Sequence, residues 1–69
     1  MSLEERMAQL RDLFRQADRP LGKAEIAAIL GINRDTPRHA INALVAEGWL
    51  EPTDTNLRSP VLRYRRLGD

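Results

Sequence analysis

Side chains that hydrogen bond well with nucleic acid are concentrated in one short segment, residues 33–42: they are Arg34, Thr36, Arg38, His39 and Asn42. Arginine donates two hydrogen bonds to the O6 and N7 edge of guanine, threonine contacts a base, a methyl group or a phosphate, and asparagine reads an adenine or holds a phosphate. Apolar residues at helical spacing accompany these polar groups: Ile32, Ile41, Leu44 and Val45. The segment therefore predicts a helix rooted in a core, with its polar face directed outward.

The composition offers little for catalytic or metal chemistry. Cysteine is absent, so the chain has neither a disulfide framework nor a thiolate metal site. His39 is the only histidine and lacks partners for a metal site, so we expect it at the surface or against a phosphate. Glu4 and Glu5 are adjacent and point to different parts of a helix, and no glycine-rich phosphate loop is present. We therefore predict no catalytic residue, metal or cofactor, and no enzymatic activity.

Charge and hydropathy indicate which partners and which cellular compartment the protein could have. The net charge is only +1, which is weak evidence for a polyanionic partner, but arginines are concentrated toward the end of the chain, at Arg58, Arg63, Arg65 and Arg66. No apolar run approaches the roughly 20 residues that cross a bilayer, and the chain begins with acidic rather than basic residues. We expect a soluble, cytoplasmic protein without membrane contact.

The 69 residues suffice for one small domain, spanning 1–69, and three helices are predicted in it. The first, about 3–17, begins at a capping box of Ser2 and Glu5 and carries one apolar stripe: Leu3, Met7, Leu10, Leu13, Phe14 and Ala17. The second, about 23–30, ends at Gly31, which favours a left-handed stop, and its predicted inward face is Ile26, Ala27, Ile29 and Leu30. The third spans about 34–47 and ends before Gly48.

A β-hairpin is predicted over about 49–66. Apolar and arginine residues alternate from Leu62 to Arg65, which is typical of a half-buried strand, and a polar loop precedes them. Pro52 and Pro60 cannot donate to a strand ladder, so they belong at edges or strand ends. Trp49 and Tyr64 are expected to pack the hairpin onto the helices.

Three helices with a tight joint between the second and third, followed by an arginine-bearing hairpin, follow the order of a winged helix-turn-helix. Residues 25–50 resemble the DNA-binding domains of bacterial regulators of the GntR, MarR and IclR type, and the resemblance covers nearly the whole chain. It rests on a small residue at the helix crossing, a turn glycine, a residue plugging the turn, a glycine ending the third helix and a core leucine: Ala27, Gly31, Ile32, Gly48 and Leu50. The implied fold is mainly α with a small β-hairpin.

The resemblance implies specific roles for exposed residues. In these families the first turn of the third helix enters the DNA major groove, and the matching positions are Arg34, Thr36 and Arg38. Asn42 lies one turn deeper on the same face, and His39 is adjacent to Arg38. Asn56 and Arg58 match the wing tip, which touches the minor groove or the backbone. The expected phosphate contacts are Lys23, Arg63 and Arg65.

Pro37 departs from the family pattern, which usually has a valine, isoleucine or leucine at this position. If Asn33 caps the third helix, Pro37 removes a hydrogen bond from its first turn. If Thr36 is the cap, Pro37 takes the favoured first position instead, and Arg34 and Asp35 lie in the turn. We favour the later start. Asp35 would then pair with Arg38 or accept from a cytosine amine.

The predicted function is sequence-specific binding of double-stranded DNA, through the third helix in the major groove and the arginine-bearing wing. The protein would be a small bacterial or phage transcriptional regulator, such as a simple repressor or a recombination accessory factor. Because one module gives a small interface, we expect a homodimer or a cooperative oligomer on repeated half-sites. The alternative is a winged-helix protein–protein interaction module within a larger assembly. Pairing of Arg34 and Arg38 with nearby carboxylates would favour that alternative.

Overall fold

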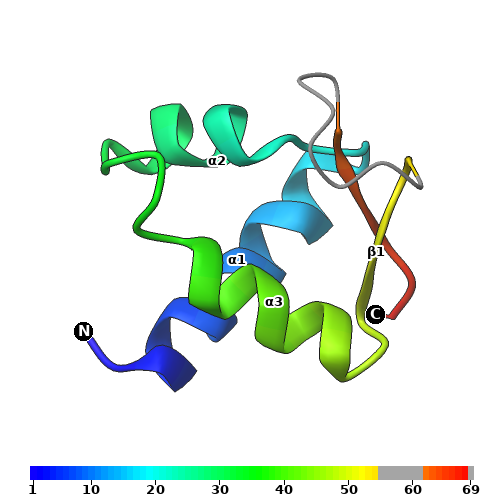
Figure 1. Ribbon diagram of the computed structural model, residues 1–69, viewed down its shortest axis with the longest axis horizontal. Coiled ribbons are helices and arrows are strands. Elements are labelled where there is room, and N and C mark those ends of the chain that lie inside the picture. The colour runs from blue at the N-terminus through cyan, green and yellow to red at the C-terminus, as the bar shows by residue number, and fades with distance from the viewer. Residues whose placement is uncertain (55–61, 69) are drawn as a thin grey trace.

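The computed structural model describes residues 1–54 and 62–68, and within them three helices precede an antiparallel hairpin (Figure 1). The elements are α1 (Leu3–Ala17), α2 (Lys23–Leu30), α3 (Arg38–Ala46), β1 (Leu50–Pro52) and β2 (Tyr64–Arg66). In Figure 1, α1 passes behind α3, and the hairpin stands beside the end of α3. This order of elements confirms the predicted fold class, a mainly α winged helix-turn-helix with a small β-hairpin.

The first helix begins at the predicted capping box. Ser2 Oγ accepts a hydrogen bond from the Glu5 N–H at 3.1 Å, and the Glu5 carboxylate accepts one from the Ser2 N–H at 3.4 Å. Two N–H groups that have no partner inside the helix are thereby satisfied. The helix ends before Asp18, which adopts a left-handed conformation with a φ of 50° and donates its N–H to the Phe14 carbonyl. Local sequence therefore determines both ends of α1.

The turn after α2 begins at Gly31, as predicted. Gly31 has a φ of 68°, and the next N–H, that of Ile32, donates to the Ala27 carbonyl at 3.0 Å. No atom lies within 4 Å of the position that a Cβ of residue 31 would occupy. The backbone conformation rather than crowding therefore favours glycine at this position.

For two residues, the prediction that the side chain faces the core is wrong. Ile29 is 53% exposed and Leu3 is 50% exposed. In α2, Ile26, Ala27 and Leu30 together span the arc that faces the core, and a step of 100° per residue places Ile29 outside that arc. Leu3 is the first residue of α1, one turn before the first buried residue of that helix.

The third helix begins later than the predicted residue 34. The segment from Asn33 to Pro37 forms consecutive turns instead, in which the Thr36 N–H donates to the Asn33 carbonyl at 3.0 Å and the Arg38 N–H donates to the Asp35 carbonyl at 3.3 Å. The cause is Pro37, because a proline disfavours helical geometry in the residue before it. Regular hydrogen bonding starts only when Ile41 N–H donates to the Pro37 carbonyl at 2.9 Å.

The hairpin is short and has a precise register. Leu50 pairs with Arg66, Glu51 with Arg65, and Pro52 with Tyr64, so Pro52 occupies a strand end as expected. Pro60 lies outside the described residues. A further strand-like contact was not predicted from the sequence: Leu21, between α1 and α2, forms an antiparallel bridge with Tyr64, and both of its backbone hydrogen bonds are formed.

The core lies where α1, α3 and the hairpin meet. Its buried apolar side chains come from all three helices, from the connection between α1 and α2 and from β1: Met7, Leu10, Phe14, Leu21, Ile26, Ala40, Ile41, Leu44 and Leu50. Trp49 and Tyr64 are partly buried against this cluster, as predicted, and the Trp49 ring meets Phe14 edge-on with 6.3 Å between ring centroids. Fully burying an aliphatic side chain stabilises a fold by about 1.5–3 kcal/mol, so this shared cluster holds α3 in place.

Candidate nucleic-acid interface

The turn before α3 positions the first two predicted DNA-binding residues. Asn33 organises it, since its side-chain oxygen accepts the Asp35 N–H at 3.0 Å in addition to the backbone bond from Thr36. Arg34 and Thr36 are both exposed on this turn. They therefore approach a partner from the loop rather than from the first helical turn. The helix starts late, as we favoured, but its cap is Pro37 and not Thr36.

Pro37 anchors this turn to the core. Its side chain is fully buried. No helical hydrogen bond is lost, because the helix begins after it, and its fixed φ suits a helix entrance. The proline therefore supplies an apolar contact to the core from the turn on which Arg34 and Thr36 are exposed.

The exposed face of α3 carries the remaining predicted residues of this region. Arg38, His39 and Asn42 are all exposed, whereas Ala40, Ile41 and Leu44 of the same helix are buried. Arg38 and Asn42 are four residues apart and therefore lie on one side of the helix, one turn from each other. We call Arg34, Thr36, Arg38, His39 and Asn42 the α3 face.

Arginines elsewhere in the described part of the chain have side-chain acceptors. Hydrogen bonds or ion pairs join them to Gln9 or to carboxylates, and they are Arg6, Arg11, Arg15, Arg19, Arg63, Arg65 and Arg66. Within residues 1–54 and 62–68, only Arg34 and Arg38 among the arginines lack such a partner. Asp35 pairs with neither. The two guanidinium groups of the α3 face therefore keep all their donors available to a ligand.

Two of the three described residues that were predicted to contact phosphates, Arg63 and Arg65, are paired with carboxylates, unlike the arginines of the α3 face. Arg63 Nε lies 3.1 Å from Glu25 Oε1, and Arg65 pairs with Glu51, its cross-strand neighbour. Both arginine side chains are more than half exposed. Lys23, half-buried at the first residue of α2, has no ion-pair partner in the described part of the chain. Asn56 and Arg58, predicted at the wing tip, lie outside the described residues.

Glu25 is a residue whose importance the sequence did not reveal. Its carboxylate accepts from Arg19 Nη1 at 2.8 Å, from the Gly22 N–H at 3.1 Å and from Arg63. Hydrogen bonds from Arg19, Gly22 and Arg63, in that order of size, lower the pKa of Glu25 from 4.5 to about 2. The carboxylate thus joins the start of α2 to the preceding connection and to the residue before β2. Sequence spacing could have indicated only the hydrogen bond from the Gly22 N–H, since Glu25 stands three residues after Gly22.

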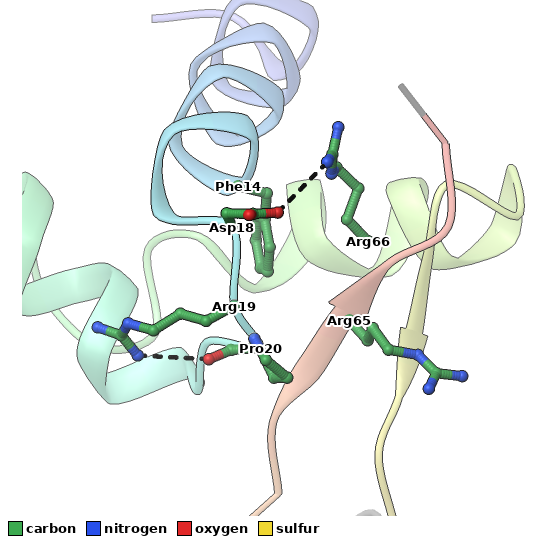
Figure 2. Close-up of a pocket in the computed structure, with 6 residues that line it drawn as sticks. All are labelled: Phe14, Asp18, Arg19, Pro20, Arg65 and Arg66. Carbon is green, nitrogen blue, oxygen red and sulfur yellow. Dashed lines mark hydrogen bonds and ion pairs between the residues drawn. The ribbon is translucent and has the colours of Figure 1, made fainter.

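A shallow cavity beside the hairpin is a poor candidate for a ligand site. Phe14, Asp18, Arg19, Pro20, Arg65 and Arg66 line it. Figure 2 shows the three guanidinium groups pointing in different directions: Arg19 toward the Pro20 carbonyl, Arg66 toward Asp18, and Arg65 away from both. An anion site needs convergent donors, and these diverge. Among the described residues, no group of three or more histidine, cysteine or acidic side chains could hold a metal ion.

A comparison with protein families agrees with this geometry. The model of the IclR helix-turn-helix domain matches residues 5–54, most of the chain. This chain belongs to the IclR helix-turn-helix family. Members of this winged helix-turn-helix family are bacterial transcription regulators, so the domain is a DNA-binding one. No curated protein and no solved structure gives a match.

The matched range contains the whole α3 face of this IclR-type domain, and it ends at residue 54, before the second strand of the hairpin. The family match therefore covers the helices and β1 but not β2. It does not assign roles to individual side chains, which are inferred from their geometry. None of the described helices is long and apolar enough to cross a membrane.

Proposed function

We propose that this domain binds double-stranded DNA in a sequence-specific manner, with the α3 face in the major groove. The observation that carries the proposal is the contrast among the described arginines: Arg34 and Arg38 are exposed and have no side-chain acceptor among the described residues, whereas every other described arginine bonds to a carboxylate or to Gln9. An unpaired guanidinium retains the two parallel donors that recognise guanine O6 and N7. Pairing with Asp35 would have favoured the protein-interaction alternative, and no such pair is present among the described residues.

The residues of the α3 face have distinct parts in this proposal. Arg38 reads a base from the first residue of α3, and Asn42 reads a base or holds a phosphate one turn further along. Arg34 and Thr36 approach from the turn, and His39 lies at the margin against the backbone. Their exposure and their common position supply the support for these roles.

Backbone contacts are assigned to Lys23, Arg63 and Arg65, and, from the family resemblance, to Asn56 and Arg58, which lie outside the described residues. Such contacts fix the position of a protein on DNA without reading its sequence. One small domain covers few base pairs, so we expect a homodimer or a cooperative oligomer on repeated half-sites. A protein of this kind regulates transcription in the cytoplasm by occupying an operator.

Selection of bound duplexes from a random pool, followed by titration of the selected duplex, tests the proposal. Arg38→Ala is expected to reduce the preference for the selected over a random duplex by about 1–3 kcal/mol, because a bidentate base contact is lost. Arg6→Ala is the matched control, since its guanidinium donates to Gln9 within α1, and it should leave the preference unchanged. Recovery of no common sequence, or equal losses from both substitutions, would refute sequence reading by α3.

A further inference from the structure

The two arginines that flank Tyr64 are each paired with a carboxylate on a neighbouring element. Arg65 pairs with Glu51, which lies directly opposite it in the antiparallel register, and Arg63 pairs with Glu25 at the start of α2. Figure 2 shows the Arg65 side chain extending across the hairpin, away from the cavity beside it. These guanidinium groups are therefore already bound to anions before any DNA arrives.

A carboxylate and a phosphate use the same donors of a guanidinium, so they compete for it. A carboxylate that remains beside the arginine also repels an approaching phosphate. The α3 face has no such competitor among the described residues, as the free guanidinium groups of Arg34 and Arg38 show. The structure thus combines an unpaired surface for reading bases with a paired surface for contacting the backbone.

The pairs are also weak enough to be exchanged. The side chains of Arg65 and Glu51 are 60% and 37% exposed, and exposed ion pairs contribute only about 0–1 kcal/mol. Glu25 is held more firmly, because it accepts from Arg19 and from the Gly22 N–H as well as from Arg63. Arg65 should therefore be released more easily than Arg63.

We propose that Glu51 and Glu25 compete with DNA phosphates for Arg65 and Arg63, so that the hairpin adds little sequence-independent affinity to the contacts made by α3. The inference rests on the proposed DNA-binding function. It assigns to Glu51 a role in lowering the affinity of the domain for DNA of any sequence. Because such a carboxylate weakens binding to every sequence equally, it leaves the ratio of affinities between sites to the contacts of α3.

Glu51→Gln is the sharper test, because Glu25 also satisfies the Gly22 N–H at the start of α2. Binding to a random-sequence duplex is measured over a range of salt concentrations. The variant is expected to bind up to about fivefold more tightly near 0.15 M salt, the upper end for an exposed pair. The plot of log affinity against log salt should steepen by up to about 0.9, one additional phosphate contact. Glu51→Thr, which suits a strand, should give the same gain.

Two further variants separate this mechanism from a general effect of charge. Asp12→Asn removes a carboxylate paired with Arg15 within α1, so it makes the same change in charge without releasing a hairpin arginine. It should leave the slope unchanged, because salt near 0.15 M screens charges beyond about 8 Å. Glu51→Gln combined with Arg65→Gln should abolish the gain. Equal gains from Glu51→Gln and Asp12→Asn, or a gain that persists in the double variant, would overturn the inference.

Elution from immobilised heparin separates failure of the inference from failure of the proposed function. Heparin is a polyanion that offers no base edges, so binding to it requires no reading by α3. If no variant binds duplex DNA, the proposed function fails. The competition then stands if Glu51→Gln elutes at higher salt than Asp12→Asn, and it falls if the two elute together.

Discussion

Replacement of Glu25 by glutamine should destabilise the domain at neutral pH and have little effect in acid. The glutamine keeps the shape of the side chain and one oxygen acceptor, but it removes the negative charge that Arg19, Gly22 and Arg63 surround. The substitution therefore isolates the electrostatic part of the link between α2 and the hairpin.

The magnitude and the pH range follow from the pKa of Glu25. Its fall from 4.5 to about 2 corresponds to at most about 3 kcal/mol of added stability of the charged form. The side chain is 33% exposed, so solvent screening reduces the expected contribution to about 1–2 kcal/mol. Because the pKa of the folded state is the lower one, this contribution is complete above about 4.5 and is lost as the pH falls toward 2.

Urea unfolding of the wild type and of Glu25→Gln, at a series of pH values from 7 to 2.5, measures this contribution. The difference in free energy of unfolding should be about 1–2 kcal/mol at pH 7 and should shrink steadily below pH 4.5. Glu4→Gln, an exposed α1 carboxylate without an ion pair among the described residues, should change stability by no more than about 0.5 kcal/mol. A difference that stays constant with pH would refute the electrostatic explanation.

Three other substitutions test the packing that supports the α3 face. Leu44→Ala should lower the free energy of unfolding in urea by about 2–5 kcal/mol, because Leu44 is fully buried. Gly31→Ala should cost about 1 kcal/mol in the same measurement, since a φ of 68° is strained for alanine although space for its Cβ is open. Gly68→Ala would place a Cβ inside the Trp49 indole, so the fluorescence of Trp49 should shift to longer wavelength as the ring moves toward solvent. No shift would show that the chain end does not pack on Trp49.

The sequence predicted those parts of the fold that depend on local chemistry. The capping box of Ser2 and Glu5, the left-handed Gly31 and the helical spacing of the core residues each act over a few positions, so inspection of the sequence finds them. The start of α3 was less certain, because both Asn33 and Thr36 could cap a helix. Neither is the cap in the structure, where Pro37 precedes the first helical residue.

Interactions between distant residues could not be predicted in this way. The bridge between Leu21 and Tyr64 and the ion pair between Glu25 and Arg63 join segments on opposite sides of α3 in the sequence. Nothing near Leu21 in the sequence signals a strand, because a single bridged residue has no periodicity. In the candidate site, the exposure of Arg38 and Asn42 followed from helical spacing, but the pairing of Arg65 with Glu51 required knowledge of the strand register.

Backbone amide NMR shifts, recorded on addition of a selected duplex, show whether the α3 face forms the DNA interface. We expect the largest changes within residues 34–42, with smaller changes at Lys23 and in the hairpin. Residues of α1 that face away from α3 should change least. Changes concentrated in α1 or around the exposed Ile29, with residues 34–42 unaffected, would show that DNA binds elsewhere.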